Sequence, residues 1–147
     1  MKTKEQRHQL YLQRLAEDPD YNKKKYKQRT KKANSDRRYF ASRRFTEQKS
    51  KAETKRKIPF RLDREKTINL IAESQTCSLS GRELMFQVGH PDCPSIDRIN
   101  SQRGYTKSNI QIVSARINQA KNDMAQEEFV QMCLDVVKYN GYRVRAK

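Results

Sequence analysis

The segment PSIDRINSQRGYTKSN, residues 94–109, combines residue types that suit phosphate or metal chemistry. Asp97 stands beside Arg98 in a short β-like run, and Asn109 closes the polar loop that follows. A carboxylate is a ligand that hard cations such as Mg²⁺ prefer, and an arginine can clamp a phosphate or stabilise developing negative charge. A guanidinium stays protonated at neutral pH, so Arg98 cannot be a general base and another group must accept the proton.

The elements that must position these residues follow from the local pattern. SIDRI at 95–99 and IQIVS at 110–114 are short strand-like runs on either side of the polar loop. ARINQAKND at 115–123 is expected to be helical, with Asn118 on its first turns and Lys121 three residues later on the same face. The predicted order is therefore strand, polar loop, strand, helix.

Two further helices and a turn complete the compact half of the chain. A helix is expected within LDREKTINLIAESQ, and Ser-Gly at 80–81 indicates a β-hairpin or tight loop. AQEEFVQMCLDVVKYN has the periodicity of an amphipathic helix that ends near Gly141. Its predicted inward face consists of Phe129, Met132, Cys133, Val136 and Val137.

Over about residues 77–129 this order resembles the ββα-metal fold of the HNH endonucleases. The similarity is greatest to a subgroup common in phage proteins, in which Ser-Ile-Asp-Arg-Ile replaces the usual Asp-His. The matching elements, in order, are CSLSG at 77–81, SIDRI at 95–99, GYT at 104–106, NI at 109–110, NQAK at 118–121 and EEF at 127–129.

The resemblance implies a catalytic role for each polar residue of the pattern. Asp97 and the side-chain oxygen of Asn118 would bind a divalent metal ion, with Mg²⁺ expected and Mn²⁺ as the alternative. Asn109 would hold the loop and orient the active-site strand, and Lys121 would neutralise phosphate. Arg98 would clamp phosphate or stabilise the transition state. The implied activity is hydrolysis of DNA phosphodiester bonds by a phage-encoded, homing-type or other HNH nuclease.

The proton acceptor has several candidates. His90 lies in the loop that enters the first strand, and imidazole is the usual proton acceptor near neutral pH. Tyr105 is the second candidate, although a ring at this place is also expected to pack within the loop. A third option is a metal-bound water that reacts with little help from the protein, or a site that is degenerate.

The chain of 147 residues has a formal net charge of +16, which predicts an anionic partner. Residues 1–57 hold 20 Lys and Arg against 7 Asp and Glu, whereas residues 58–147 hold 13 against 10. Residues 3–16, 19–33 and 35–55 are expected to form solvated helices, whose aromatic rings either stack on nucleic acid or pack against the C-terminal half. The predicted DNA-binding residues are Lys23, Lys24, Lys25, Lys27, Arg29, Arg37, Arg38, Arg43, Arg44 and Lys121.

These observations predict an α+β fold: a small ββα-metal core flanked by helices, with a basic helical N-terminal extension. The domains would be a DNA-binding extension at 1–57 and a nuclease domain at 58–147. The three scattered cysteines, Cys77, Cys93 and Cys133, are expected to be thiols. The sequence contains no apolar run that would span a membrane and no secretory signal, so we expect a cytoplasmic protein, in the host cytoplasm if phage-encoded.

Two further classes of function fit the same composition. A nucleic-acid-binding protein with a decayed nuclease core would have the same charge and fold, without cleavage. A ribosomal or RNA-processing factor would prefer RNA to duplex DNA. The expected partner for the leading interpretation is double-stranded DNA, bound by a chain for which a monomer is favoured.

Overall fold

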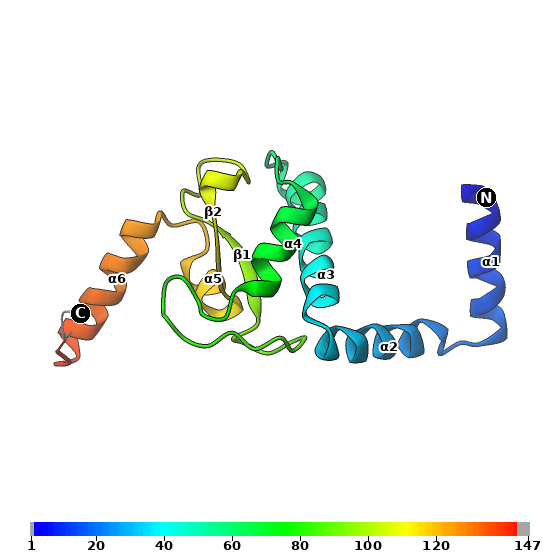
Figure 1. Ribbon diagram of the computed structural model, residues 1–147, viewed down its shortest axis with the longest axis horizontal. Helices are drawn as coiled ribbons and strands as arrows, with labels where there is room; N and C mark the ends of the chain where they lie inside the picture. Colours follow the sequence, from blue (N-terminus) through cyan, green and yellow to red (C-terminus); the bar gives the residue numbers. More distant parts are fainter. Residues whose placement is uncertain (1, 144–147) are drawn as a thin grey trace.

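The computed structural model describes residues 2–143, which form an α+β fold, as predicted. Figure 1 shows a central body with a helical arm on one side and a single helix on the other. The elements run in the order α1 (Lys4–Glu17), α2 (Tyr21–Ser35), α3 (Arg37–Ser50), the π-helical segment η1 (Lys51–Arg56), α4 (Arg64–Glu73), β1 (Pro94–Arg98), the 3₁₀ turn η2 (Lys107–Asn109), β2 (Ile110–Ser114), α5 (Ala115–Lys121) and α6 (Gln126–Tyr139).

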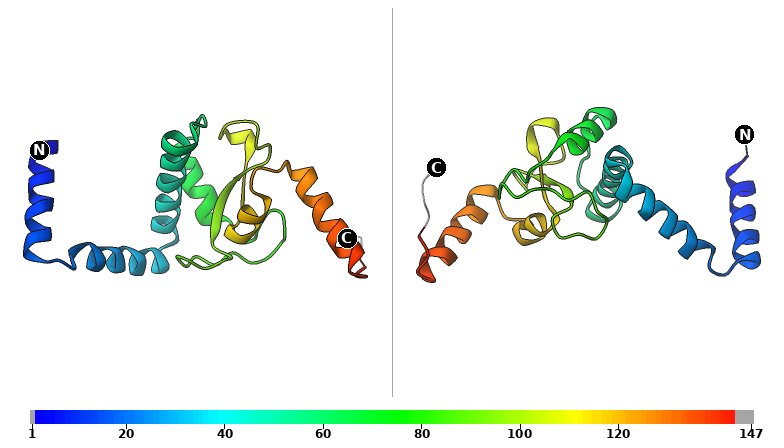
Figure 2. Two further views of the ribbon diagram at one scale, coloured as in Figure 1. Left: turned by 180° about the vertical axis from the view of Figure 1, so that it is seen from behind. Right: turned by 60° about the horizontal axis from the view of Figure 1, so that its bottom comes forward.

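The arm consists of α1 and α2, which extend away from the body in every view (Figures 1 and 2). Thr3 and Gln6 form a capping box at the start of α1, each side chain accepting a hydrogen bond from the other's backbone N–H. Of these two helices only Ala33 is buried. The arm therefore depends on capping and helix propensity rather than on a core of its own.

α3 packs into the body although it is as basic as the arm. Phe40 and Phe45 are 2% and 5% exposed, and Ala41 and Ala52 are fully buried. The ring of Phe45 meets Phe60 edge to face, with the centroids 5.4 Å apart. For Phe40 and Phe45, therefore, the ring packs within the protein rather than standing free for nucleic acid. The domain division after residue 57 stays a prediction, but the packing that joins the two halves already begins at α3.

β1 and β2 form an antiparallel pair, and α5 follows β2 directly, which is the predicted strand–loop–strand–helix order. The register pairs Asp97 with Gln111 and Ile96 with Ile112. Ile96 and Ile112 are buried in the core shared with α3 and α4. The Ser114 side chain accepts a hydrogen bond from the first turn of α5, so the helix begins where the strand ends.

α6 leaves the body, and its predicted inward face is confirmed only at its first turn. Phe129 is 5% exposed, but Met132 is 41% and Val136 58% exposed, and Cys133 is exposed as well. Val137 is half-buried. The amphipathic pattern identified the helix correctly, yet periodicity alone does not supply an element for the apolar face to pack on.

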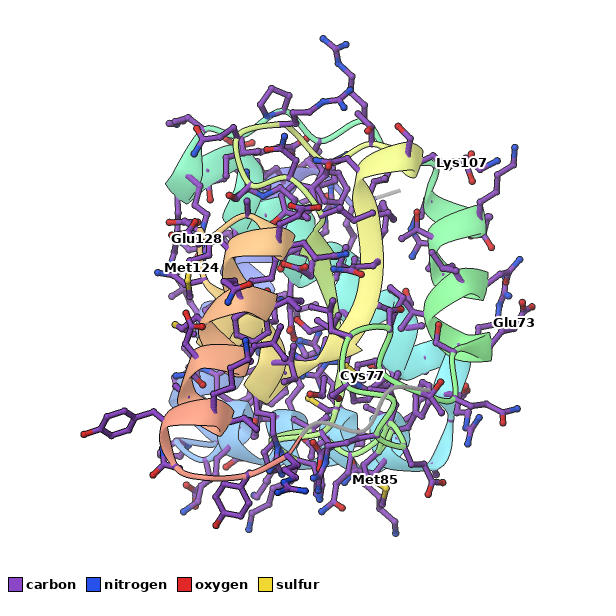
Figure 3. The ribbon with its side chains drawn as sticks, turned by 90° about the vertical axis from the view of Figure 1, so that its left-hand side faces the viewer. Glu73, Cys77, Met85, Lys107, Met124 and Glu128 are labelled. Carbon is purple, nitrogen blue, oxygen red and sulfur yellow. The ribbon has the colours of Figure 1, made fainter. Side chains whose placement is uncertain are left out.

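The turn between α5 and α6 explains this departure. Asn122 adopts a positive φ of 49°, which ends α5 and redirects the chain. Figure 3 shows Met124 and Glu128 at the start of α6, on the opposite side of the strand pair from α4, where Glu73 points outward. Within residues 2–143, no helix has the length and apolar character that a membrane span requires.

Candidate active site

Asp97 is buried on β1 with both carboxylate oxygens occupied. Its Oδ1 accepts a hydrogen bond from Lys121 Nζ at 3.2 Å, and its Oδ2 accepts one from Gln111 Nε2 at 2.9 Å. Gln111 is the register partner of Asp97 on β2, and Lys121 comes from the last turn of α5. Each carboxylate oxygen has two lone pairs, so these contacts leave acceptor capacity toward the cavity that Asp97 lines.

Lys121 is completely buried, so the prediction that it neutralises a DNA phosphate conflicts with its position. Its ammonium group forms an ion pair with Asp97 and donates a second hydrogen bond, of 2.8 Å, to the Arg98 carbonyl. A buried charge needs such partners because desolvation is costly. Lys121 therefore fastens α5 to β1 and positions the Asp97 carboxylate.

Asn118 lines the same cavity and has a free amide oxygen. Its Nδ2 donates to Ser95 Oγ at 2.7 Å and to the Ile96 carbonyl at 3.2 Å. The carbonyl can only accept, which fixes the orientation of the amide. Within residues 2–143, no hydrogen bond reaches Asn118 Oδ1. That oxygen is available to a ligand, as the predicted role requires.

Asn109 closes the loop between the strands. Its Oδ1 accepts from the Asn100 backbone N–H at 2.9 Å, and its Nδ2 donates to the carbonyls of Asn100 and Gly104 at 3.0 and 2.9 Å. Gly104 lies against Pro59, whose carbonyl oxygen would be 2.7 Å from any Cβ at this position. These contacts explain why Asn and Gly occur at the two places, and the catalytic role of Asn109 stays a prediction.

Arg98 turns its guanidinium toward the loop. Nη1 donates to the carbonyls of Ser101 and Arg103, and Nη2 lies 3.5 Å from Asp123 Oδ1. The group also lies over the Tyr105 ring, 5.3 Å from its centroid. Arg98 is only 7% exposed. In this arrangement it holds the loop together, and a clamp on phosphate stays a prediction.

Neither His90 nor Tyr105, the two side chains predicted as proton acceptors, has an unengaged acceptor group in the cavity. His90 is not among the residues that line it, and its Nδ1 accepts a hydrogen bond from the Asp92 backbone N–H at 3.0 Å. Tyr105 lines the cavity but is 2% exposed, and its hydroxyl accepts a hydrogen bond from Gln48. The packing role expected of this ring is therefore the one observed. The geometry does not support His90 as the base, whose identity remains a prediction.

The cavity has a volume of about 280 Å³ and a mainly polar lining. It gathers Asp97, Arg98 and Asn118 from the predicted motif. It also includes three residues from α3 and η1 that motif reasoning missed: Gln48, Lys51 and Arg56. The sequence contains no local signal for these three, since their contribution depends on α3 packing beside β1.

A hard divalent cation fits this site through two protein ligands. Asp97 supplies a carboxylate and Asn118 a free amide oxygen, and such a pair leaves coordination positions for water and phosphate. Within residues 2–143, no cluster of three His, Cys, Asp or Glu side chains is present that would hold a cation unaided. Metal binding by Asp97 and Asn118 stays a prediction.

Apart from Lys121, which is buried on α5, the predicted DNA-binding cations divide between two helices. Those of α2 are exposed or half-buried on the arm: Lys23, Lys24, Lys25, Lys27 and Arg29. Those of α3 are engaged in intramolecular contacts, with Arg37 stacked on Phe86 at 4.5 Å, Arg38 bound to Glu65 at 2.6 Å, and Arg43 and Arg44 near Glu47. On α2, Lys24 pairs with Asp18 at 2.9 Å and Lys25 lies over the Tyr21 ring. Of this set, Lys23, Lys27 and Arg29 therefore have no such contact with any described residue and are available to an external anion.

Comparison with known proteins supports the fold. No family model and no curated protein matches the chain. Among solved structures, the chain is similar to the rare-cutting HNH restriction endonuclease PacI, with a TM-score of 0.53 and 15% sequence identity. The alignment covers 67% of this chain and 78% of PacI. At this identity the similarity concerns the fold, and it shows that the strand pair and following helix resemble the HNH fold.

Proposed function

We propose that the chain is a metal-dependent DNA endonuclease of HNH type. The observation that carries this proposal is the meeting of the Asp97 carboxylate and the unpaired Asn118 oxygen on one polar cavity. The resemblance of the fold to a DNA-cutting enzyme supports the same substrate class. The narrower assignment, to a phage-encoded homing-type nuclease, rests on the order of motifs in the sequence.

Each residue of the site has a defined task in this proposal. Asp97 and Asn118 hold the metal ion, which, when bound, would neutralise charge on the phosphate and the leaving oxygen. Lys121 and Gln111 keep the Asp97 carboxylate in place through their hydrogen bonds. Arg98 and Asn109 hold the loop that borders the cavity. The α1–α2 arm adds affinity for flanking DNA by releasing counterions.

The competing function, a nucleic-acid-binding protein with an inactive nuclease core, is favoured by one observation. Of the residues between 2 and 143 that line the cavity, Asp97 is the one Asp, Glu or His, so this part of the chain supplies no second group of these kinds as a proton acceptor. This chain would then use its basic surface for binding alone. The two functions differ in whether the protein cleaves DNA when a divalent metal is added.

Cleavage of supercoiled plasmid across a metal series tests the proposal, with Asp97→Asn as the site variant. Both Asp97→Asn and Asp97→Ala remove the counter-charge of the buried Lys121, a change that costs about 3–5 kcal/mol when a buried ion pair is broken. Asparagine keeps the side-chain volume and an oxygen acceptor for Lys121, so it is the milder of the two. We expect cleavage with Mg²⁺ or Mn²⁺, none in EDTA, and a loss of rate of about 100-fold or more in Asp97→Asn. Thermal unfolding checks that the variant is folded.

Two results would contradict this function. Wild-type protein that binds DNA but never nicks it with either metal would favour the binding-only function. Wild-type cleavage that Asp97→Asn retains at full rate would place the active site elsewhere. RNA bound more tightly than duplex DNA at matched salt would favour an RNA-directed role.

A further inference from the structure

η1 gives the cavity two cationic side chains that lie outside the HNH-like motif. Lys51 and Arg56 both line it, together with Gln48 from the end of α3. Lys51 and Arg56 are five residues apart. In a π-helix the backbone hydrogen bond joins residues with this spacing, so the two residues are separated by about one turn. In an α-helix the same spacing is about 1.4 turns and would point the two side chains to different faces. The π-helical conformation thus explains how both reach one cavity.

The core holds η1 in this position. Ala52, the residue after Lys51, is fully buried in the cluster formed by α3, α4 and the strands. Gln48, one turn earlier, donates a hydrogen bond to the hydroxyl of Tyr105, which also lines the cavity. After η1 the chain pairs with the loop, where the Tyr105 N–H donates to the Pro59 carbonyl at 2.9 Å. A segment anchored on both sides can present its charges at fixed places.

The two cations of η1 that line the cavity have no ion pair among the described residues, unlike Arg98 and Lys121 of the motif. Lys51 and Arg56 are exposed, and neither forms an ion pair with any residue in the part of the chain that the structure describes. Arg98 is occupied by loop carbonyls and Lys121 by Asp97. The two cations able to contact a ligand in the cavity are therefore those of η1.

The charges of the side chains that line the cavity favour binding of an anion before binding of a metal ion. Among the described residues that line it, Asp97 is the one carboxylate and is already paired with Lys121. Lys51 and Arg56 are positive and have no ion pair there, whereas Arg98 lies 3.5 Å from Asp123. Positive charges close together in a confined site repel a free divalent cation and attract a phosphate. A bound phosphate supplies the negative charge and the oxygen atoms that a metal ion on Asp97 and Asn118 still needs.

We propose that Lys51 and Arg56 hold the scissile phosphodiester of DNA against Asp97 and Asn118, and that this contact forms without metal. The inference rests on the proposed function and assigns the phosphate-binding half of the same site. The two halves come from different parts of the chain: the motif supplies the metal ligands, and η1 supplies the phosphate ligands.

Lys51→Gln and Arg56→Gln test this proposal against Lys55→Gln. Lys55 is exposed on the same segment and is not among the residues lining the cavity, so its replacement removes equal charge at a neighbouring place. The first measurement is the affinity of the full chain for a short DNA duplex in EDTA at several salt concentrations. We expect the slope of log K against log salt to fall by about 1 in Lys51→Gln and Arg56→Gln, and to stay unchanged in Lys55→Gln.

The second measurement is the single-turnover cleavage rate at saturating DNA with Mg²⁺. We expect a loss of about 100-fold in Lys51→Gln and Arg56→Gln, because each removes charge stabilisation at the reacting phosphate, and a wild-type rate in Lys55→Gln. A changed salt slope with an unchanged single-turnover rate would overturn the proposal, since the residues would then contact only flanking phosphates.

The outcomes separate this inference from the proposed function. If wild-type protein does not cleave, the nuclease function fails, while the EDTA measurement still tests phosphate binding by Lys51 and Arg56. If wild-type protein cleaves and all three variants bind and cleave alike, the nuclease function stands and the role of η1 is refuted. Equal thermal midpoints for the three variants verify that the comparison is made between folded proteins.

Discussion

α2 and α3 are neighbouring basic helices of similar length, yet α3 buries Phe40, Ala41 and Phe45, whereas α2 buries only Ala33 near its end. α2 presents Tyr26, which is 58% exposed, whereas the corresponding aromatic face of α3 carries Phe45, which is 5% exposed. α3 and η1 also place Ala41 and Ala52 at the contact, and small residues allow helices to approach closely. A few apolar positions on one face therefore decide whether a helix packs on the body. The average charge of the helix does not reveal these positions.

The cations of the two helices differ in the same way. Arg38 of α3 binds Glu65, and Arg44 lies over the Phe40 ring and beside Glu47. Lys23 and Lys27 of α2 are exposed, with no ion pair to any residue in the described part of the chain. Counting positive residues therefore overestimates the free cations of α3 more than those of α2, where Lys24 is paired with Asp18. DNA binding by either helix stays a prediction.

Two truncations should show the largest effect of this difference. Removal of residues 1–57 deletes Phe40 and Phe45, each worth about 3–5 kcal/mol when truncated to alanine, from a fold whose total stability is about 5–15 kcal/mol. We expect that fragment to lose its cooperative thermal transition in circular dichroism, and a chain starting at residue 31 to keep it. A cooperative transition near that of the full chain in the shorter fragment would support a domain boundary after residue 57.

Single substitutions in α2 and α3 should change the stability less than the truncations do, and they compare the two helices residue by residue. Phe45→Ala should lower the free energy of unfolding by about 3–5 kcal/mol, because it leaves a cavity beside Phe60. Tyr26→Ala should change it by no more than about 0.5 kcal/mol, since the ring is mostly exposed. Urea denaturation measures both values. Equal losses for the two variants would mean that α2 packs as α3 does.

The smallest expected effect is on the salt dependence of DNA binding. Lys23→Gln and Lys27→Gln should each lower the slope of log K against log salt by about 0.9, the value for one lost phosphate contact on duplex DNA. Arg38→Gln removes the same charge but should leave the slope unchanged, because Glu65 already neutralises this guanidinium. A reduced slope for Arg38→Gln would show that the ion pair opens on DNA.

Local pattern was sufficient for most of the fold. The predicted helices of the arm agree with α1 and α2 to within two residues at each end, and the strand–loop–strand–helix order is correct. The prediction of buried residues failed for α6, where burial depends on a neighbouring element. The face of α6 from Met132 to Val136 was expected to be buried and is exposed, since nothing in the periodicity of a helix specifies whether a neighbour exists.

Only the part of the candidate site that comes from consecutive elements of the chain was predictable from the sequence. The spacing from Asp97 to Asn118 follows from a strand, a loop, a second strand and a helix that are consecutive in the chain. The contacts of Lys121 and Arg98 were not predictable, because a buried ion pair and an external phosphate contact require the same residue type. Burial and partners distinguish the two, and both depend on the packed structure.

The sequence by itself therefore determined the order of elements, because this order depends on residue type and short spacing. The oxygen ligands of the site and an anionic partner stay predictions. Only the tertiary structure decided which cations remain free. α3 and η1 bury Phe40, Phe45, Ala41 and Ala52 in the body. With this packing, Lys51 and Arg56 line the same cavity as Asp97, which lies more than 40 positions away in the chain. Such long-range contacts arise from burial of apolar surface, which no local motif encodes.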